Sequence, residues 1–138
     1  MSDGWVDKVW GKTREITSDK VYSLHELDVI AGSYCSMHYH KFRSNKFIVN
    51  SGVINVVEFY GPHIKTTTLK SGDSLSVPAL VVHLFAVIES GSIYEEYFSE
   101  HGDVDPNDII RIVSGGLCDD FDLLPNKLLL SAINGLNV

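Results

Sequence analysis

Most of the chain is a succession of short segments in which apolar and polar residues alternate, or in which β-branched and aromatic residues are concentrated. Such segments are typical of β-strands, because successive side chains of a strand point to opposite faces of a sheet. Glycine, proline, serine and asparagine separate the segments, as expected for turns. The sequence therefore predicts strands at residues 13–17, 20–31, 34–40, 46–50, 53–60, 63–70, 74–78, 81–88 and 92–98.

The spacing of the turns indicates the fold class. Turn signals recur roughly every 8 to 12 residues, and no amphipathic segment of about 15 residues lies between them. Alternating strand–helix units are therefore disfavoured, because each would need such a segment between two strands. The pattern predicts an all-β sandwich or barrel.

The chain changes character after the last predicted strand. Residues 99–108 are acidic and polar, and Pro106 begins either a short helix or an extended lead-in to a last strand. Pro125 and Gly135 suit the start and the end of a helix whose leucines pack on the barrel or on a second subunit. We expect one domain over residues 1–138, made of an N-terminal arm (1–12), a barrel (about 13–100) and a helical or irregular C-terminal extension (about 101–138).

Composition and charge narrow the class of partner. The chain has 138 residues, enough for one sizeable core, and a formal net charge of −7 with a pI of about 5.2. An acidic surface disfavours nucleic acid and anionic membranes as partners, whereas local cations still permit a small anionic substrate. The two cysteines form no CxxC pattern, residues 1–12 do not resemble a signal peptide, and no apolar run reaches the ~20 residues of a membrane helix. These features predict a cytoplasmic protein.

The most informative residues are His38-Tyr39-His40, inside a predicted strand. Residues two apart on a strand face the same way, so the two imidazoles project together and Tyr39 faces the other side. A third histidine, His83, lies in another predicted strand. Imidazole nitrogens bind zinc, iron, nickel, copper and manganese, and three protein ligands leave room for water or substrate. The three histidines are candidate metal ligands, provided that the fold brings His83 to the pair.

The spacing around these histidines resembles the two sequence motifs of the cupin superfamily. One motif runs from a glycine through His-x-His to a second glycine, and the other runs from a glycine through a proline to a histidine; the matching residues are Gly32, His38, His40, Gly52, Gly72, Pro78 and His83. Asn45 stands where the first motif has glutamate, and Leu80 and Val87 replace a glycine and an asparagine of the second. The resemblance implies a double-stranded β-helix, or jelly-roll barrel, in which the three histidines converge on one divalent transition metal ion.

The flanks of the barrel resemble the cupin domain of type II phosphomannose isomerases. The correspondence runs through Trp10-Gly11, Met37-His38, His40, Glu96 and Asp108-Ile109-Ile110-Arg111. It implies an isomerase-like enzyme that acts on a sugar or sugar phosphate, and catalytic roles for Glu96 and Arg111. Homodimerisation, which is usual in the superfamily, is also implied. The segment that follows Arg111 departs from that family's ending.

The change of glutamate to Asn45 has an electrostatic consequence. Three neutral imidazoles leave a divalent ion with its full charge, and an amide oxygen is a poorer ligand for a transition metal than a carboxylate. Another carboxylate beside the ion would reduce the charge of the site again. Glu95 and Glu96 are adjacent on one predicted strand, so only one of them faces inward, and the family correspondence favours Glu96. The identity of the metal stays open among zinc, iron, manganese and nickel.

Two other functions fit the same residues. Three-histidine cupins include metal dioxygenases, and their ligand set resembles this one. The change at Asn45 also suits a non-catalytic module that holds a small sugar or acid in its barrel. Lys41, Arg43 and Lys46 lie beside the His-x-His sequence and offer a binding group for a phosphate or carboxylate, but we favour a solvated, charged surface turn. We interpret His25 and His101 as surface or loop residues.

Overall fold

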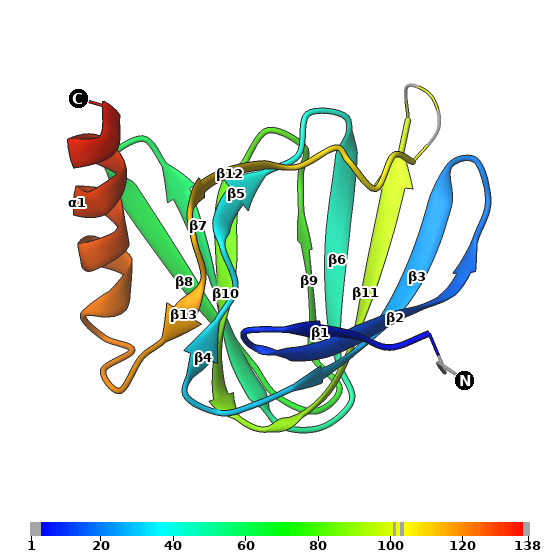
Figure 1. Ribbon diagram of the computed structural model, residues 1–138, viewed down its shortest axis with the longest axis horizontal. Helices are drawn as coiled ribbons and strands as arrows, with labels where there is room; N and C mark the ends of the chain where they lie inside the picture. Colours follow the sequence, from blue (N-terminus) through cyan, green and yellow to red (C-terminus); the bar gives the residue numbers. More distant parts are fainter. Residues whose placement is uncertain (1–3, 101, 103, 137–138) are drawn as a thin grey trace.

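The computed structural model describes residues 4–100, 102 and 104–136, so His101 lies outside the described residues. Two β-sheets face each other, and one helix lies along the outer side of one sheet (Figure 1). The elements are β1 (Val6–Lys8), β2 (Gly11–Ser18), β3 (Tyr22–Val29), β4 (Ser33–Tyr34), β5 (Met37–Tyr39), β6 (Arg43–Val49), β7 (Val53–Tyr60), β8 (His63–Leu69), β9 (Ser74–Val77), β10 (Val82–Glu89), β11 (Gly91–Ser99), β12 (Ile110–Val113), β13 (Gly116–Leu117) and α1 (Leu124–Leu136).

Every strand pairing is antiparallel within the described range, and the predicted all-β architecture is confirmed. Sheet A has the strand order β1-β2-β3-β11-β6-β9. Sheet B has the order β12-β5-β10-β4-β13, and β7 and β8 extend it from β10. Between β3 and β12 the chain crosses repeatedly from one sheet to the other, as in Greek-key and jelly-roll barrels.

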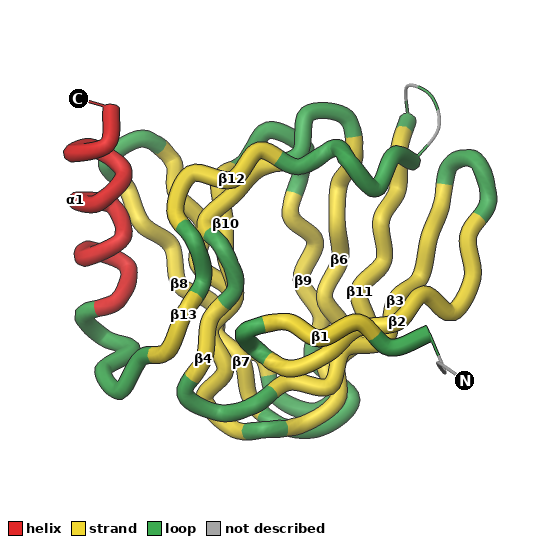
Figure 2. The backbone as a smooth tube through the Cα atoms, viewed as in Figure 1, coloured by secondary structure: helices red, strands yellow, loops and turns green. Residues whose placement is uncertain are grey.

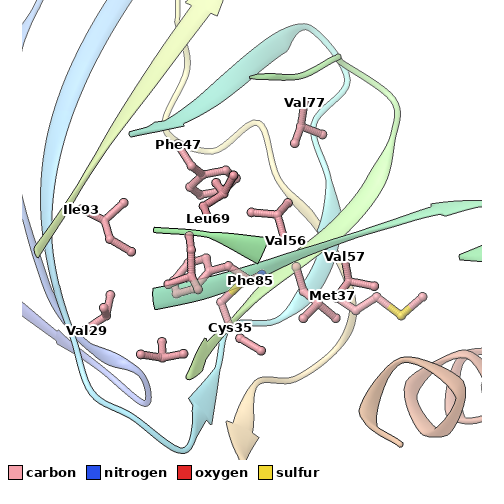
Figure 3. Packing of buried hydrophobic residues seen from close by; sticks show 14 of the residues in the cluster. Val29, Cys35, Met37, Phe47, Val56, Val57, Leu69, Val77, Phe85 and Ile93 are labelled. Atoms are coloured by element: carbon pink, nitrogen blue, oxygen red, sulfur yellow. Dashed lines mark hydrogen bonds between the residues drawn. The ribbon is translucent and has the colours of Figure 1, made fainter. Parts of the chain in front are cut away.

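The core explains why β10 is one continuous apolar run rather than an alternating one. The inner face of β10 carries Phe85, which packs edge-on against Phe47 of sheet A with ring centroids 5.8 Å apart. Its outer face is also buried, because α1 covers that side of sheet B (Figure 1). Figure 3 shows the same division, with Met37 and Val57 on the helix side and Phe47 between the sheets. A strand that is buried on both faces has no polar positions to alternate.

The predicted strand at 34–40 is interrupted. Tyr34 pairs with Ala86 and His38 pairs with His83, so four steps along one strand match three steps along β10. This is a β-bulge, in which one extra residue shifts the alternation of faces. Met37 therefore points toward α1 (Figure 3), whereas Cys35 and His38 both line the cavity between the sheets.

The C-terminal part follows one of the two predicted alternatives. Pro106 and Asn107 lie in a turn that leads through residues 108–109 into β12, and the expected helix is α1, with Pro125 in its first turn. The α1 helix has 13 residues. In the described part of the chain, no helix combines the length and the apolar character needed to cross a membrane.

Two motif glycines allow a test of the turns that close the barrel. Gly52 and Gly72 both have positive φ angles, +85° and +89°. A Cβ atom at Gly52 would lie 2.7 Å from the carbonyl oxygen of Glu89, whereas one at Gly72 would meet open space. We expect Gly72→Ala to lower the free energy of unfolding by ~1 kcal/mol, the cost of the left-handed backbone alone, and Gly52→Ala to lower it by ~3 kcal/mol. Urea denaturation measures both, and equal losses would contradict the argument from close approach.

Candidate metal centre

The pairing of β5 with β10 places His38 directly opposite His83. His40 follows β5 and faces the same way as His38. One ring nitrogen from each of the three histidines lies within 4.8 Å of the other two, and all three side chains are buried. The structure thus brings together the histidines that the sequence names as metal ligands.

A backbone carbonyl fixes the tautomer of each imidazole. A carbonyl oxygen only accepts hydrogen bonds, so a close Nδ1 must carry the proton and Nε2 is left with a free lone pair. The three contacts from Nδ1 to the carbonyl oxygen are His38 to Ser36 at 2.6 Å, His40 to Asp108 at 2.7 Å, and His83 to Val81 at 2.8 Å. Histidines that bind a metal through one ring nitrogen usually donate the other ring N–H to a carbonyl or carboxylate oxygen in this way.

The free nitrogens test whether a metal ion fits. The Nε2 atoms of His40 and His83 are buried, and they have no hydrogen-bond partner among the described residues. A buried, unpaired polar atom costs free energy, so each one needs an explanation. A divalent transition metal ion would satisfy both atoms at once, and the donor set of imidazole nitrogens suits such an ion. The residues present therefore fit the ion that the sequence motifs imply.

The environment keeps these imidazoles neutral, which metal binding requires. Burial, together with the neighbouring His83 and His40, lowers the pKa of His38 to about 2. Burial also lowers the pKa of His40 to about 4, although the hydrogen bond to the Asp108 carbonyl opposes the change. The pKa of His83 is lowered mainly by burial. At neutral pH the three rings therefore do not compete with a metal ion by binding protons.

Asp108 anchors the segment that carries His40. Its carboxylate accepts hydrogen bonds from the backbone N–H groups of Lys41, Phe42 and Arg43, at 2.8, 2.9 and 3.1 Å. Burial raises the pKa of Asp108, but these three bonds outweigh it and the net pKa is lowered. Arg43 Nε lies 3.3 Å from His40 Nδ1, and the shorter contact with the Asp108 carbonyl decides where the proton sits.

A cavity of about 800 Å³ lies beside the histidines. Both sheets contribute to its walls, and they face each other in Figure 2. Of the three histidines, His38 lines the cavity. The other lining groups that matter for binding are aromatic or polar: Trp10, Phe47, Phe85, Tyr97, Arg43, Glu95, His25 and Arg111.

Glu95, and not Glu96, faces the cavity, which corrects the expectation from the family correspondence. Strand alternation places Glu95 on the same face as the buried Ile93. The side-chain N–H of Asn45 donates a hydrogen bond to Glu95 Oε2 at 2.9 Å. Glu96 points to the opposite face, where its carboxylate interacts with the Tyr22 hydroxyl. Burial raises the pKa of Glu95, although hydrogen bonds from Asn45 and Tyr97 oppose this.

Arg43 lines the cavity, so the favoured interpretation of its turn as solvated was wrong for this residue. It is the first residue of β6, it is only 6% exposed, and its guanidinium carbon lies 3.8 Å from the centroid of the Tyr97 ring. The Tyr97 ring in turn packs edge-on against His40, with centroids 5.5 Å apart. The sequence signal for the inward orientation of Arg43 is the pair of apolar residues Phe47 and Val49 on the same strand, because residues an even number of positions apart share a face.

The remaining predicted residues are placed as follows. Arg111 is exposed at the edge of the cavity, where β12 pairs it with His38. His25 lies half-buried on β3 and lines the cavity, so its interpretation as a surface residue was wrong. Lys41 and Lys46 are exposed, as expected.

Sequence comparison agrees with this geometry. The profile of the family described as mannose-6-phosphate isomerase C-terminal matches residues 3–123. The chain belongs to this family. Its domain is a cupin, so the resemblance that the two motifs indicated is confirmed. No curated relative matches the sequence.

Solved structures share the cupin fold at low sequence identity. Oxalate decarboxylase from Bacillus subtilis aligns with a TM-score of 0.68 and 15% identity, over 78% of this chain and 29% of that one. KdgF from Halomonas sp. aligns with a TM-score of 0.61 and 17% identity, over 70% and 87% of the two chains. This cupin thus spans less than a third of that oxalate decarboxylase chain. A further structure of the Bacillus subtilis enzyme, 14% identical with a TM-score of 0.68, describes its Mn(II) centres.

The lowered histidine pKa values predict how the stability of the metal-free cupin depends on pH. A histidine whose pKa is lower in the folded state stabilises that state above pH ~6.5, and this contribution is lost as the pH falls toward the folded value. For His40 the window runs from about 6.5 down to about 4. We expect a loss of ~1.4 kcal/mol per pH unit for each such histidine. Urea denaturation at pH 7.5, 6 and 5 measures it.

A variant separates the contribution of His40 to the free energy of unfolding from that of Glu95. The raised pKa of Glu95 makes the free energy of unfolding change with pH in the opposite direction. His40→Gln removes one titrating group, so its unfolding free energy should fall less steeply with pH than that of the wild type. Identical slopes would show that His40 is not buried and neutral in the folded protein.

Proposed function

We propose that this cupin binds a divalent transition metal ion through His38, His40 and His83 and acts on a small carbohydrate in the adjoining cavity, as a sugar-phosphate isomerase does. The observation that carries the proposal is the convergence of three imidazoles, each held by a carbonyl with Nε2 free, beside a cavity lined by aromatic and charged side chains. Membership of the mannose-6-phosphate isomerase C-terminal family supports the carbohydrate as substrate class.

The size and lining of the cavity support this substrate class. A volume of about 800 Å³ accommodates a monosaccharide derivative together with water. A sugar presents apolar C–H faces and several hydroxyl groups. The aromatic rings of Trp10, Phe47 and Phe85 suit the former, and the charged groups of Arg43 and Glu95 suit the latter.

The chain's own residues supply the groups that isomerisation requires. Interconversion of an aldose and a ketose moves one proton between two adjacent carbons and another between their oxygens, with no net oxidation. Glu95 is the candidate for the carbon-bound proton, because burial raises its pKa toward the value that suits a general acid–base group. Arg111 holds an anionic group of the substrate at the edge of the cavity. When bound, a metal ion polarises a carbonyl or hydroxyl oxygen as a Lewis acid.

A second candidate function is a metal dioxygenase. The observation that favours it is the donor set of three neutral imidazoles, with the neutral Asn45 in place of a carboxylate. A non-catalytic sugar-binding cupin uses the same cavity without turnover. Within either function, the ligand remains a small sugar, sugar phosphate or acid.

We also propose a cytoplasmic homodimer, for which the exposed Leu130 and Ile133 of α1 supply apolar surface.

Glu95 and Glu96 provide a matched pair for testing the acid–base role. Glu95→Gln should lower kcat for aldose–ketose interconversion by ~10²–10⁴-fold while metal content stays unchanged. Glu96→Gln, on the opposite face of β11, should change kcat by less than about twofold. The assay uses mannose 6-phosphate and a panel of related sugars and sugar phosphates. If the metal-loaded protein turns over none of them, the isomerase proposal fails.

Elemental analysis separates the candidate functions. The purified cupin should contain about one transition metal ion per chain, and replacement of His83 by alanine should remove it, because two imidazoles hold such an ion much more weakly than three. Iron together with substrate-dependent oxygen consumption would establish the dioxygenase instead. Metal-free protein that a sugar stabilises without conversion would establish the binding module.

A further inference from the structure

Sheet B carries a row of five ionisable residues, one on each of five neighbouring strands. The register pairs Lys65 with Glu58, Glu58 with His83, His83 with His38, and His38 with Arg111. Residues directly opposite each other in an antiparallel pair share a face, with Cβ atoms about 4.5–5.5 Å apart. Glu58 on β7 is therefore the immediate neighbour of His83, on the side away from His38.

The environment of Glu58 is unusual for a carboxylate. Its side chain is only 2% exposed. The Tyr60 hydroxyl donates a hydrogen bond to Oε2, but Oε1 is buried and has no partner among the described residues. Glu58 forms no ion pair in the described part of the chain, although the exposed Lys65 lies opposite. A buried carboxylate oxygen without a partner is costly, unless a cation is part of its environment.

The other buried carboxylates near the histidines are already engaged. Three backbone N–H groups hold the carboxylate of Asp108. The side-chain amide of Asn45 holds Glu95, which also lies near Arg43. Among the described residues, Glu58 is the acidic side chain that has both a free buried oxygen and a direct cross-strand neighbour among the metal ligands.

We infer that Glu58 supplies the carboxylate of the metal centre, in the place of the ligand that is lost at Asn45. The inference rests on the proposed metal site. Three neutral imidazoles leave a divalent ion with a charge of +2 in a buried setting, and Glu58 reduces that charge to +1. Glu58 lies outside the group of ligand atoms within 4.8 Å, so its side chain must change rotamer to reach the ion.

Zinc affinity tests the inference without reference to activity. Competition with a chelator at pH 7.5 gives the Kd of the wild type, Glu58→Gln and Glu95→Gln. Glu58→Gln removes the charge and keeps the shape, so we expect the Kd to rise by ~10–100-fold. Glu95→Gln neutralises a buried carboxylate that Asn45 already holds, and we expect a change of less than about threefold. Equal affinities of Glu58→Gln and wild type would overturn the inference.

A crystal structure of the zinc-loaded wild type gives a result that does not depend on how a variant folds. We expect a Glu58 oxygen at about 2.0–2.2 Å from the ion. A zinc ion held by the three histidines, with Glu58 still bonded only to Tyr60, would overturn the inference and leave the proposed metal site intact. A wild type that binds no transition metal would instead refute the metal site itself.

Discussion

The candidate metal centre depends on the register between β5 and β10. The extra residue between β4 and β5 reverses the alternation of faces, so Cys35 and His38 both point between the sheets although they are three residues apart. A regular strand from Cys35 would turn Met37 inward and both His38 and His40 outward. The bulge therefore converts a His-x-His sequence into two inward imidazoles opposite His83. Sheet B keeps β10 in position for this pairing, because β7 pairs with β10 along its length.

The orientation of the rings has a partly local and a partly distant origin. Ser36 and Val81 each lie two residues before the histidine that they hold, so the backbone just before each strand sets the tautomers of His38 and His83. His40 depends instead on the carbonyl of Asp108, 68 residues later in the chain. The Asp108 carboxylate fixes the turn after His40 as well. One residue near β12 therefore governs both the position and the proton of a metal ligand, which gives the late segment a role in the site.

Features that follow from strand periodicity and motif spacing were predictable from the sequence. The predictions failed where it was necessary to know which face of a strand points toward the inside of the barrel. The three histidines and most strands were predictable because alternation is a local rule. The same rule states that Glu95 and Glu96 face opposite ways, but not which one faces inward. Both faces of β11 carry aromatic or aliphatic residues, so tertiary pairing decides. Arg43 was misjudged because the turn around it is polar, whereas its partners in alternation, Phe47 and Val49, are buried.

The asparagine at position 45, where the motif has glutamate, hydrogen-bonds to a carboxylate on the neighbouring strand β11. Asn45 Nδ2 lies 2.9 Å from a carboxylate oxygen of Glu95, and both side chains are buried. A glutamate at position 45 would place a second carboxylate against Glu95, and two buried anions at that distance cannot both stay ionised. An amide instead donates a hydrogen bond, so Asn45 is the residue that is compatible with an inward carboxylate at Glu95. The asparagine at the motif position and the buried Glu95 therefore depend on each other. The barrel lacks a carboxylate at position 45, where the motif has a metal ligand, and has one at Glu95 on the cavity wall.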